Sequence, residues 1–110
     1  MKLPPGVDVR VGYPFWLRLL LMRNVAAITI GRRIWIAHDL APAELEALLR
    51  HELVHVRQMG ERGVIFFFLR YAAEYVANRC RRMGHDAAYR AISFEREAFE
   101  AERAPARPAA

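Results

Sequence analysis

The pattern of apolar and polar positions divides the chain into an N-terminal part typical of strands and a longer helical part. Residues 1–12 alternate weakly between apolar and polar side chains, which predicts a short edge strand. Two runs rich in β-branched residues, 26–30 and 33–37, flank Gly31-Arg32. Because a glycine in a two-residue connection favours a tight turn, these runs predict a β-hairpin.

The remaining apolar positions recur at helical spacing. This periodicity, with Pro42 at a first helical position, Gly60 and Gly84 as helix ends and Asp86 as an N-cap, predicts four helices. They span residues 14–23, 42–59, 64–83 and 86–103. We expect an α+β fold in which the N-terminal β-hairpin packs over the 42–59 helix and two further helices follow. Residues 1–103 would form a single domain, and the Pro/Ala-rich tail at 104–110 would be disordered.

Composition and charge narrow the class of protein. The 110 residues carry 17 Lys+Arg against 12 Asp+Glu, a net charge of +5, and 55% of them are hydrophobic. This excludes a disordered or collagen-like chain and allows one domain without disulfides. The arginine excess is typical of proteins that bind nucleic acid or an anionic membrane. No nucleic-acid-binding signature accompanies it, so we expect solvated arginine faces and no nucleic-acid partner.

The single cysteine and the short apolar runs bear on location. Cys80 has no second cysteine with which to form an internal disulfide, which fits a reducing compartment. The apolar runs at 15–22 and 64–69 are too short to span a bilayer, and no signal-peptide cleavage site follows the first. These features predict a cytoplasmic protein.

The motif that carries chemistry is the string His51-Glu52-Leu53-Val54-His55, inside the predicted 42–59 helix. Side chains at positions i and i+4 of a helix project from the same face, so His51 and His55 can bind one zinc ion. Glu52 is then placed to act as general base toward a water on the metal. Its place on the apolar side of the helix favours a buried site, where a carboxylate needs a partner.

A catalytic zinc site takes three protein ligands and keeps one position open. Candidates for the third ligand are Cys80, His85, Glu95 and Glu97. Residues two apart on a helix face different ways, so only one of Glu95 and Glu97 can reach the metal. The residues alone leave these alternatives open.

His51 to His55 followed by Glu95-Arg96-Glu97-Ala98 resembles the gluzincin branch of the zincin-like metallopeptidases, especially its short bacterial members, the minigluzincins. The resemblance covers roughly residues 25–103 and implies a zinc-dependent peptidase that acts on peptides or proteins. It makes Glu95 the third ligand, with Ala98 packed beneath the site. Phe99 stands where the family has an acidic or amide residue, which removes a hydrogen bond that normally orients a ligand histidine.

The family layout also implies that an edge strand above the cleft pairs with an extended substrate, for which residues 33–37 are the candidate. A further side chain should steady the oxyanion of the reaction. The candidates for this role are His85, Tyr89, Tyr75 and Arg90.

Two alternative functions accompany the peptidase hypothesis. The chain is short for a peptidase, which favours a zinc-binding but non-proteolytic protein as one alternative. The other is a basic module that binds nucleic acid or a membrane surface, with an incidental His-Glu motif. The aromatic residues within 64–76 are a candidate contact with a membrane surface or a second copy.

Overall fold

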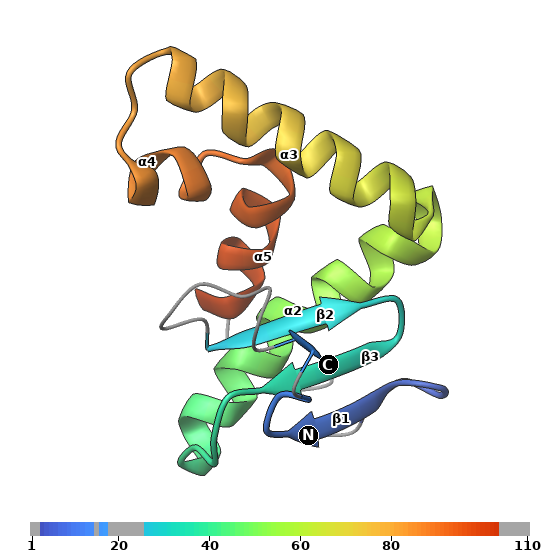
Figure 1. Ribbon diagram of the computed structural model, residues 1–110. Coiled ribbons are helices and arrows are strands. Elements are labelled where there is room, and N and C mark those ends of the chain that lie inside the picture. Colours follow the sequence, from blue (N-terminus) through green and yellow to red (C-terminus); the bar gives the residue numbers. More distant parts are fainter. Residues whose placement is uncertain (1–2, 15, 18–25, 104–110) are drawn as a thin grey trace, which may run out of the picture.

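The computed structural model describes residues 3–14, 16–17 and 26–103. It confirms the α+β class: a three-stranded sheet at the N-terminus is followed by four helices (Figure 1). Most of the helix predicted over 14–23 lies outside the described residues, although Trp16 and Leu17 are helical. The predicted tail at 104–110 lies outside them too.

The sheet contains the predicted hairpin and the short edge strand predicted within residues 1–12. Strands β2 (Ala27–Ile30) and β3 (Arg33–Ile36) pair antiparallel around Gly31, which has a φ of +65°. Strand β1 (Asp8–Val11) pairs parallel to β3, so the strand order is β1-β3-β2. The prediction that residues 33–37 form the edge strand was wrong, because β1 occupies the second side of β3. Among the described strands, β1 and β2 are the edges.

Helix α2 (Pro42–Arg62) packs beneath this sheet and carries the His-Glu motif. Pro42 opens it, where the missing N–H costs nothing. Gly60 does not end it as predicted, because a solvent-facing glycine inside a helix costs only about 1 kcal/mol. The helix ends at Gly63, whose φ of +88° is unfavourable for other residues and whose N–H donates to the carbonyl of Met59 at 2.8 Å.

The last three helices turn back toward α2. Helix α3 (Val64–Cys80) ends before the predicted residue 83, and α4 (His85–Arg90) and α5 (Ser93–Arg103) replace the single predicted 86–103 helix. The chain bends at Ile92, which is fully buried. Helix α4 starts after Gly84, with no side-chain cap, so Asp86 lies in the first turn instead of capping it.

Two apolar clusters hold the fold together, and α2 contributes to both. The first lies between the sheet and α2 and centres on Ile34, Ile36 and Leu49. The second joins α2, α3 and α5 through Met59, Phe67, Ile92 and Phe94. Because α2 contributes to both clusters, the side chains on the α5 side of α2 are held between packed layers.

Candidate metal centre

Two histidines of α2 meet one glutamate of α5 in the interior. The Nε2 atoms of His51 and His55 lie 2.8 and 2.9 Å from the same oxygen, Oε1 of Glu95. The three residues are only 4%, 5% and 4% exposed. Their ligand atoms all lie within 4.8 Å of one another, so together they could hold a metal ion. The structure thus assembles the predicted set of two imidazoles and one carboxylate.

The start of α5 is fixed by a carboxylate from α3. Glu74 accepts hydrogen bonds from the backbone N–H and the hydroxyl of Ser93, at 2.8 and 2.7 Å. This caps the helix two residues before Glu95. Ala98, one turn later, is fully buried, in agreement with the role that the resemblance implies for it. Its small side chain allows α5 to approach α2 closely enough for Glu95 to reach both histidines.

Gln58 determines which nitrogen of His55 carries a proton. Its Nε2 donates to the carbonyl of Phe94 at 3.2 Å and to the carboxylate of Glu97 at 2.7 Å. Its Oε1 therefore faces His55, 2.8 Å from Nδ1, and can only accept. A proton on Nδ1 leaves the lone pair of Nε2 for a metal. Sequence analysis missed this residue, although Gln58 lies one turn beyond His55 on the same helix.

In the metal-free protein, the charges in this cluster favour the protonated form of His55 and the ionised form of Glu95. Burial by itself would lower the pKa of His55, but the hydrogen bond and charge of Glu95 outweigh it and raise that pKa. Burial likewise acts to raise the pKa of Glu95, but hydrogen bonds from His51 and His55 hold it well below its usual range. Glu95 is therefore ionised and carries the negative charge that a cation site needs.

Phe99 and Glu102 of α5 both lie next to the ring of His51. Phe99 packs edge-on against the His51 ring, with centroids 4.6 Å apart, and so excludes water without offering an acceptor. The Glu102 carboxylate lies 3.2 Å from Nδ1 of His51, but out of line, and Nδ1 has no hydrogen-bond partner. A small rotation of Glu102 would supply the acceptor that Phe99 lacks. Glu102 follows Glu95 by two helical turns, a spacing that the sequence displays.

Tyr71 forms a hydrogen bond with the second carboxylate oxygen of Glu95, Oε2. Its hydroxyl donates to Oε2 at 2.5 Å, while Oε1 faces the two histidines. Burial, followed by the charge of Glu95, raises the pKa of Tyr71, so the phenol stays protonated and acts as a donor. Tyr71 lies on α3, far from the motif in sequence, and no spacing pattern indicated it.

Glu52 lies beside the cluster and faces the sheet. Its Oε2 accepts a hydrogen bond of 2.7 Å from the hydroxyl of Thr29, on the edge strand β2. Glu52 is 6% exposed, and burial raises its pKa even though the Thr29 bond and the histidines act against this. Burial and the charge of Glu52 raise the pKa of Tyr13 to about 12.

The other candidates from the sequence do not join the three ligand side chains. Glu97 is exposed and forms an ion pair of 2.6 Å with Arg57, and Cys80 is exposed. Tyr75 and His85 bond to each other at 2.8 Å. Of the remaining two oxyanion candidates, Arg90 pairs with the exposed Asp86. Tyr89 interacts with Glu95 instead: burial, followed by the charge of Glu95, raises the pKa of Tyr89. Of the four, only Tyr89 interacts with the metal centre among the described residues.

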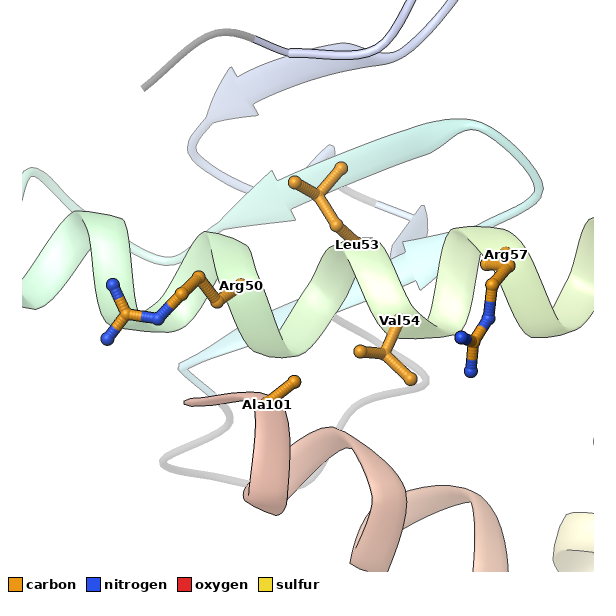
Figure 2. A pocket seen from close by; sticks show the side chains of 5 residues that line it. All are labelled: Arg50, Leu53, Val54, Arg57 and Ala101. Atoms are coloured by element: carbon orange, nitrogen blue, oxygen red, sulfur yellow. The ribbon is translucent and has the colours of Figure 1, made fainter. Parts of the chain in front are cut away.

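An open groove of about 290 Å³ lies between α2 and α5, outside this centre. In Figure 2, Val54 of α2 faces Ala101 of α5 across it, and Arg50 and Arg57 flank it along α2. Its lining includes no member of the His/Glu cluster. The groove is therefore a gap between the surfaces of α2 and α5, and it does not lead a substrate to the metal centre.

Comparison with known proteins gives one partial match. Residues 18–63 match the family model described as the eCIS core domain. The matched stretch contains β2, β3, α2 and the His51 to His55 motif, whereas Glu95 lies beyond it. It covers less than half of the chain, so the similarity holds for this part. No curated protein and no solved structure matches the chain.

Proposed function

We propose that the protein binds one zinc ion through His51, His55 and Glu95 and hydrolyses peptide bonds with Glu52 as general base. The observation that carries this proposal is the convergence of both Nε2 atoms on one carboxylate oxygen in a buried cluster. Two imidazoles and one carboxylate are a donor set typical of catalytic zinc. The eCIS core match supports a shared origin for the segment with the motif, but its description names no reaction.

The surrounding hydrogen bonds fit a metal better than they fit a metal-free cluster. Gln58 keeps the proton on Nδ1 of His55, so without a metal Nε2 must carry a second proton to face Glu95. His51 Nδ1 is buried and has no hydrogen-bond partner, with Glu102 3.2 Å away. Metal-binding histidines usually donate their other N–H to such a carboxylate. A cation between the three ligand side chains would satisfy these groups together.

The proposed chemistry assigns one proton path to Glu52. A bound zinc ion would polarise the peptide carbonyl and acidify a water molecule. The Glu52 carboxylate takes a proton from this water, whose oxygen joins the carbonyl carbon. As the C–N bond breaks, Glu52 returns the proton to the leaving amine nitrogen. Thr29 holds one oxygen of Glu52 and leaves the other for this transfer.

Strand β2 is the best candidate to hold the substrate. It is an edge of the described sheet, and Thr29 at its centre already touches Glu52. An extended peptide that added to this edge would lie next to the proposed base. Tyr89 is our candidate for the side chain that stabilises the oxyanion, since it is the member of the predicted set whose pKa is affected by the charge of Glu95.

A structural zinc site without catalysis is the second candidate function. It is favoured by the depth of the centre, since His51, His55, Glu95 and Glu52 are each no more than 6% exposed. A substrate needs an open approach to the metal, whereas a structural ion needs none.

Metal content after dialysis separates the ligand assignments. We expect about one zinc per wild-type chain, retention of this zinc in Glu97→Gln, and loss of it in Glu95→Gln. The two variants are a matched pair, because they remove the same charge from neighbouring residues of α5. Zinc-free wild type would reject the metal site, and loss in Glu97→Gln alone would reject the assignment of Glu95.

Hydrolysis of a broad peptide library by zinc-loaded protein tests the reaction. We expect cleavage by the wild type and a loss of about 100-fold or more in Glu52→Gln, which keeps the side-chain shape. If both proteins hold zinc and are equally inert, the peptidase proposal is wrong and the structural zinc site stands.

A further inference from the structure

Helix α3 has two apolar faces, and only one of them is used by the fold. Its inner face carries Phe67, which is buried, and Tyr71, which reaches the metal centre. Its outer face carries Ile65, Leu69 and Val76, which are 78%, 67% and 57% exposed. Their spacing of four and seven residues places them in one stripe along the helix.

The outer apolar face is broad. Phe66 and Phe68 are also exposed, and at about 100° per residue they lie on either side of the stripe. The stripe predicted over residues 64–76 thus splits in the structure, with part of it in the core and part in solvent. In Figure 1, α3 runs along the side of the molecule away from the sheet.

Every other exposed side chain on α3 is an alanine, an arginine or Cys80. The exposed arginines of the helix are Arg70 and Arg79, and Arg81 and Arg82 follow its C-terminal end. The single acidic residue of α3, Glu74, accepts hydrogen bonds from Ser93 and also pairs with Arg70 at 3.0 Å, so the charge of Arg70 is already balanced. No acidic side chain in the described part of the chain pairs with Arg79, Arg81 or Arg82.

The exposed face of α5 shows how unusual this composition is. There, Arg96 and Arg103 alternate with Glu97 and Glu100, as on an ordinary solvated helix. The exposed side of α3 has no carboxylate and no uncharged hydroxyl or amide side chain. Apolar side chains bordered by arginine are typical of helices that lie in the plane of a membrane surface.

We propose that the outer face of α3 docks on an anionic lipid bilayer, parallel to its surface. Ile65, Leu69 and Val76 would enter the boundary between head groups and acyl chains, and the arginines would contact lipid phosphates. Arg62 supports this at the other end of the face, because its guanidinium carbon lies 5.9 Å from the centre of the Phe66 ring. The helix lies on the bilayer in this proposal, since no described helix is long and apolar enough to cross one.

Charge favours lipid over a second copy of the chain. Two α3 helices packed face to face would bring Arg62 of one copy near either Arg62 or Arg79 of the other, depending on their direction. Neither packing offers an acidic partner from the outer face, so like charges would oppose the apolar contact. An anionic bilayer neutralises both ends of the face and buries the apolar stripe at once.

Sedimentation with vesicles tests the proposal in the full chain, with and without zinc. The probes are vesicles of phosphatidylcholine alone and with about 30% phosphatidylserine. We expect binding to the anionic vesicles that Ile65→Gln/Leu69→Gln weakens about tenfold or more. Both positions are exposed, so thermal unfolding should show that this variant folds like the wild type.

A charge-matched pair separates a docking face from net charge. Arg79→Glu/Arg82→Glu should lose about tenfold or more in affinity, whereas Arg96→Glu/Arg103→Glu, with the same net charge, should stay within about threefold of wild type. Equal losses in the two variants would overturn the proposal, as would wild-type protein that ignores anionic vesicles. A zinc-independent dimer that Ile65→Gln/Leu69→Gln dissociates would also overturn it, because the outer face would then be covered by a second copy.

Discussion

Replacement of Gln58 by leucine tests the assignment of the His55 proton. The amide makes three contacts from a buried position: His55 Nδ1 at 2.8 Å, the Phe94 carbonyl at 3.2 Å and Glu97 at 2.7 Å. Leucine fills a similar volume and makes none of them. His55 then has no partner that holds its proton on Nδ1, so its metal-facing nitrogen is no longer reserved for the ion.

The structure sets the expected size of two separate effects. Loss of a side chain that orients a metal ligand weakens metal binding by about 10- to 100-fold, which is about 1.4 to 2.8 kcal/mol. The metal-free protein should also lose about 2 to 4 kcal/mol of folding stability, because a buried N–H and a buried carbonyl lose their partner. Competition with a chromophoric chelator measures the first effect, and thermal unfolding in chelator measures the second.

Asn78→Leu is the matched control for this experiment. Asn78 is another buried amide, and its Nδ2 donates to the carbonyl of Ala88 at 3.0 Å without contacting a ligand residue. Its replacement should lower stability by about 1 to 3 kcal/mol and leave zinc affinity nearly unchanged. If Gln58→Leu binds zinc as tightly as wild type, or if both variants lose affinity equally, Gln58 does not set the His55 proton.

Three further predictions concern pH, the second oxygen of the ligand carboxylate, and the end of α2. Burial acts to lower the pKa of His55, but Glu95 raises it above 6.5. The metal-free protein should therefore lose stability as the pH rises above about 6.5 and through the raised pKa of His55. Zinc affinity should rise over the same pH range, because the metal binds the deprotonated nitrogen. Thermal unfolding with chelator and with zinc should show opposite slopes with pH; equal slopes would contradict the assignment. Tyr71→Phe removes the donor to the Glu95 carboxylate and should weaken zinc binding about tenfold in the chelator assay. Gly63→Ala should destabilise by about 1 to 2 kcal/mol at its φ of +88°, and Gly60→Ala should stabilise by about 0.5 to 1 kcal/mol, both measured by denaturant unfolding.

Residues close in sequence were predicted more successfully than those joined by tertiary contacts. The hairpin around Gly31 and helix α2 were expected because turn chemistry and helical periodicity are local. The edge strand within residues 1–12 was expected as well, but its pairing with β3 was not, because that pairing depends on how a distant segment returns to the sheet. This single contact turned the edge strand predicted at 33–37 into the central one.

The break between α4 and α5 is a second feature that the local sequence pattern did not predict. The sequence from Asp86 to Arg103 has no proline or glycine, so its local pattern predicts one helix. The burial of Ile92 and the capping of Ser93 by Glu74 favour two helices instead. Both interactions come from the packing of α3 against this segment, which no local pattern encodes.

By itself, the sequence determined the two histidines and Glu52 as a unit, since one turn of a helix fixes their mutual placement. It narrowed the third ligand to a few residues, with Glu95 favoured by resemblance. The tertiary structure decided that Glu95 rather than Glu97 meets the histidines, because the direction of α5 depends on its cap and on the buried Ala98. It also brought Thr29 and Tyr71 to the centre from β2 and α3, since hydrogen bonds between distant segments form only after the layers have packed.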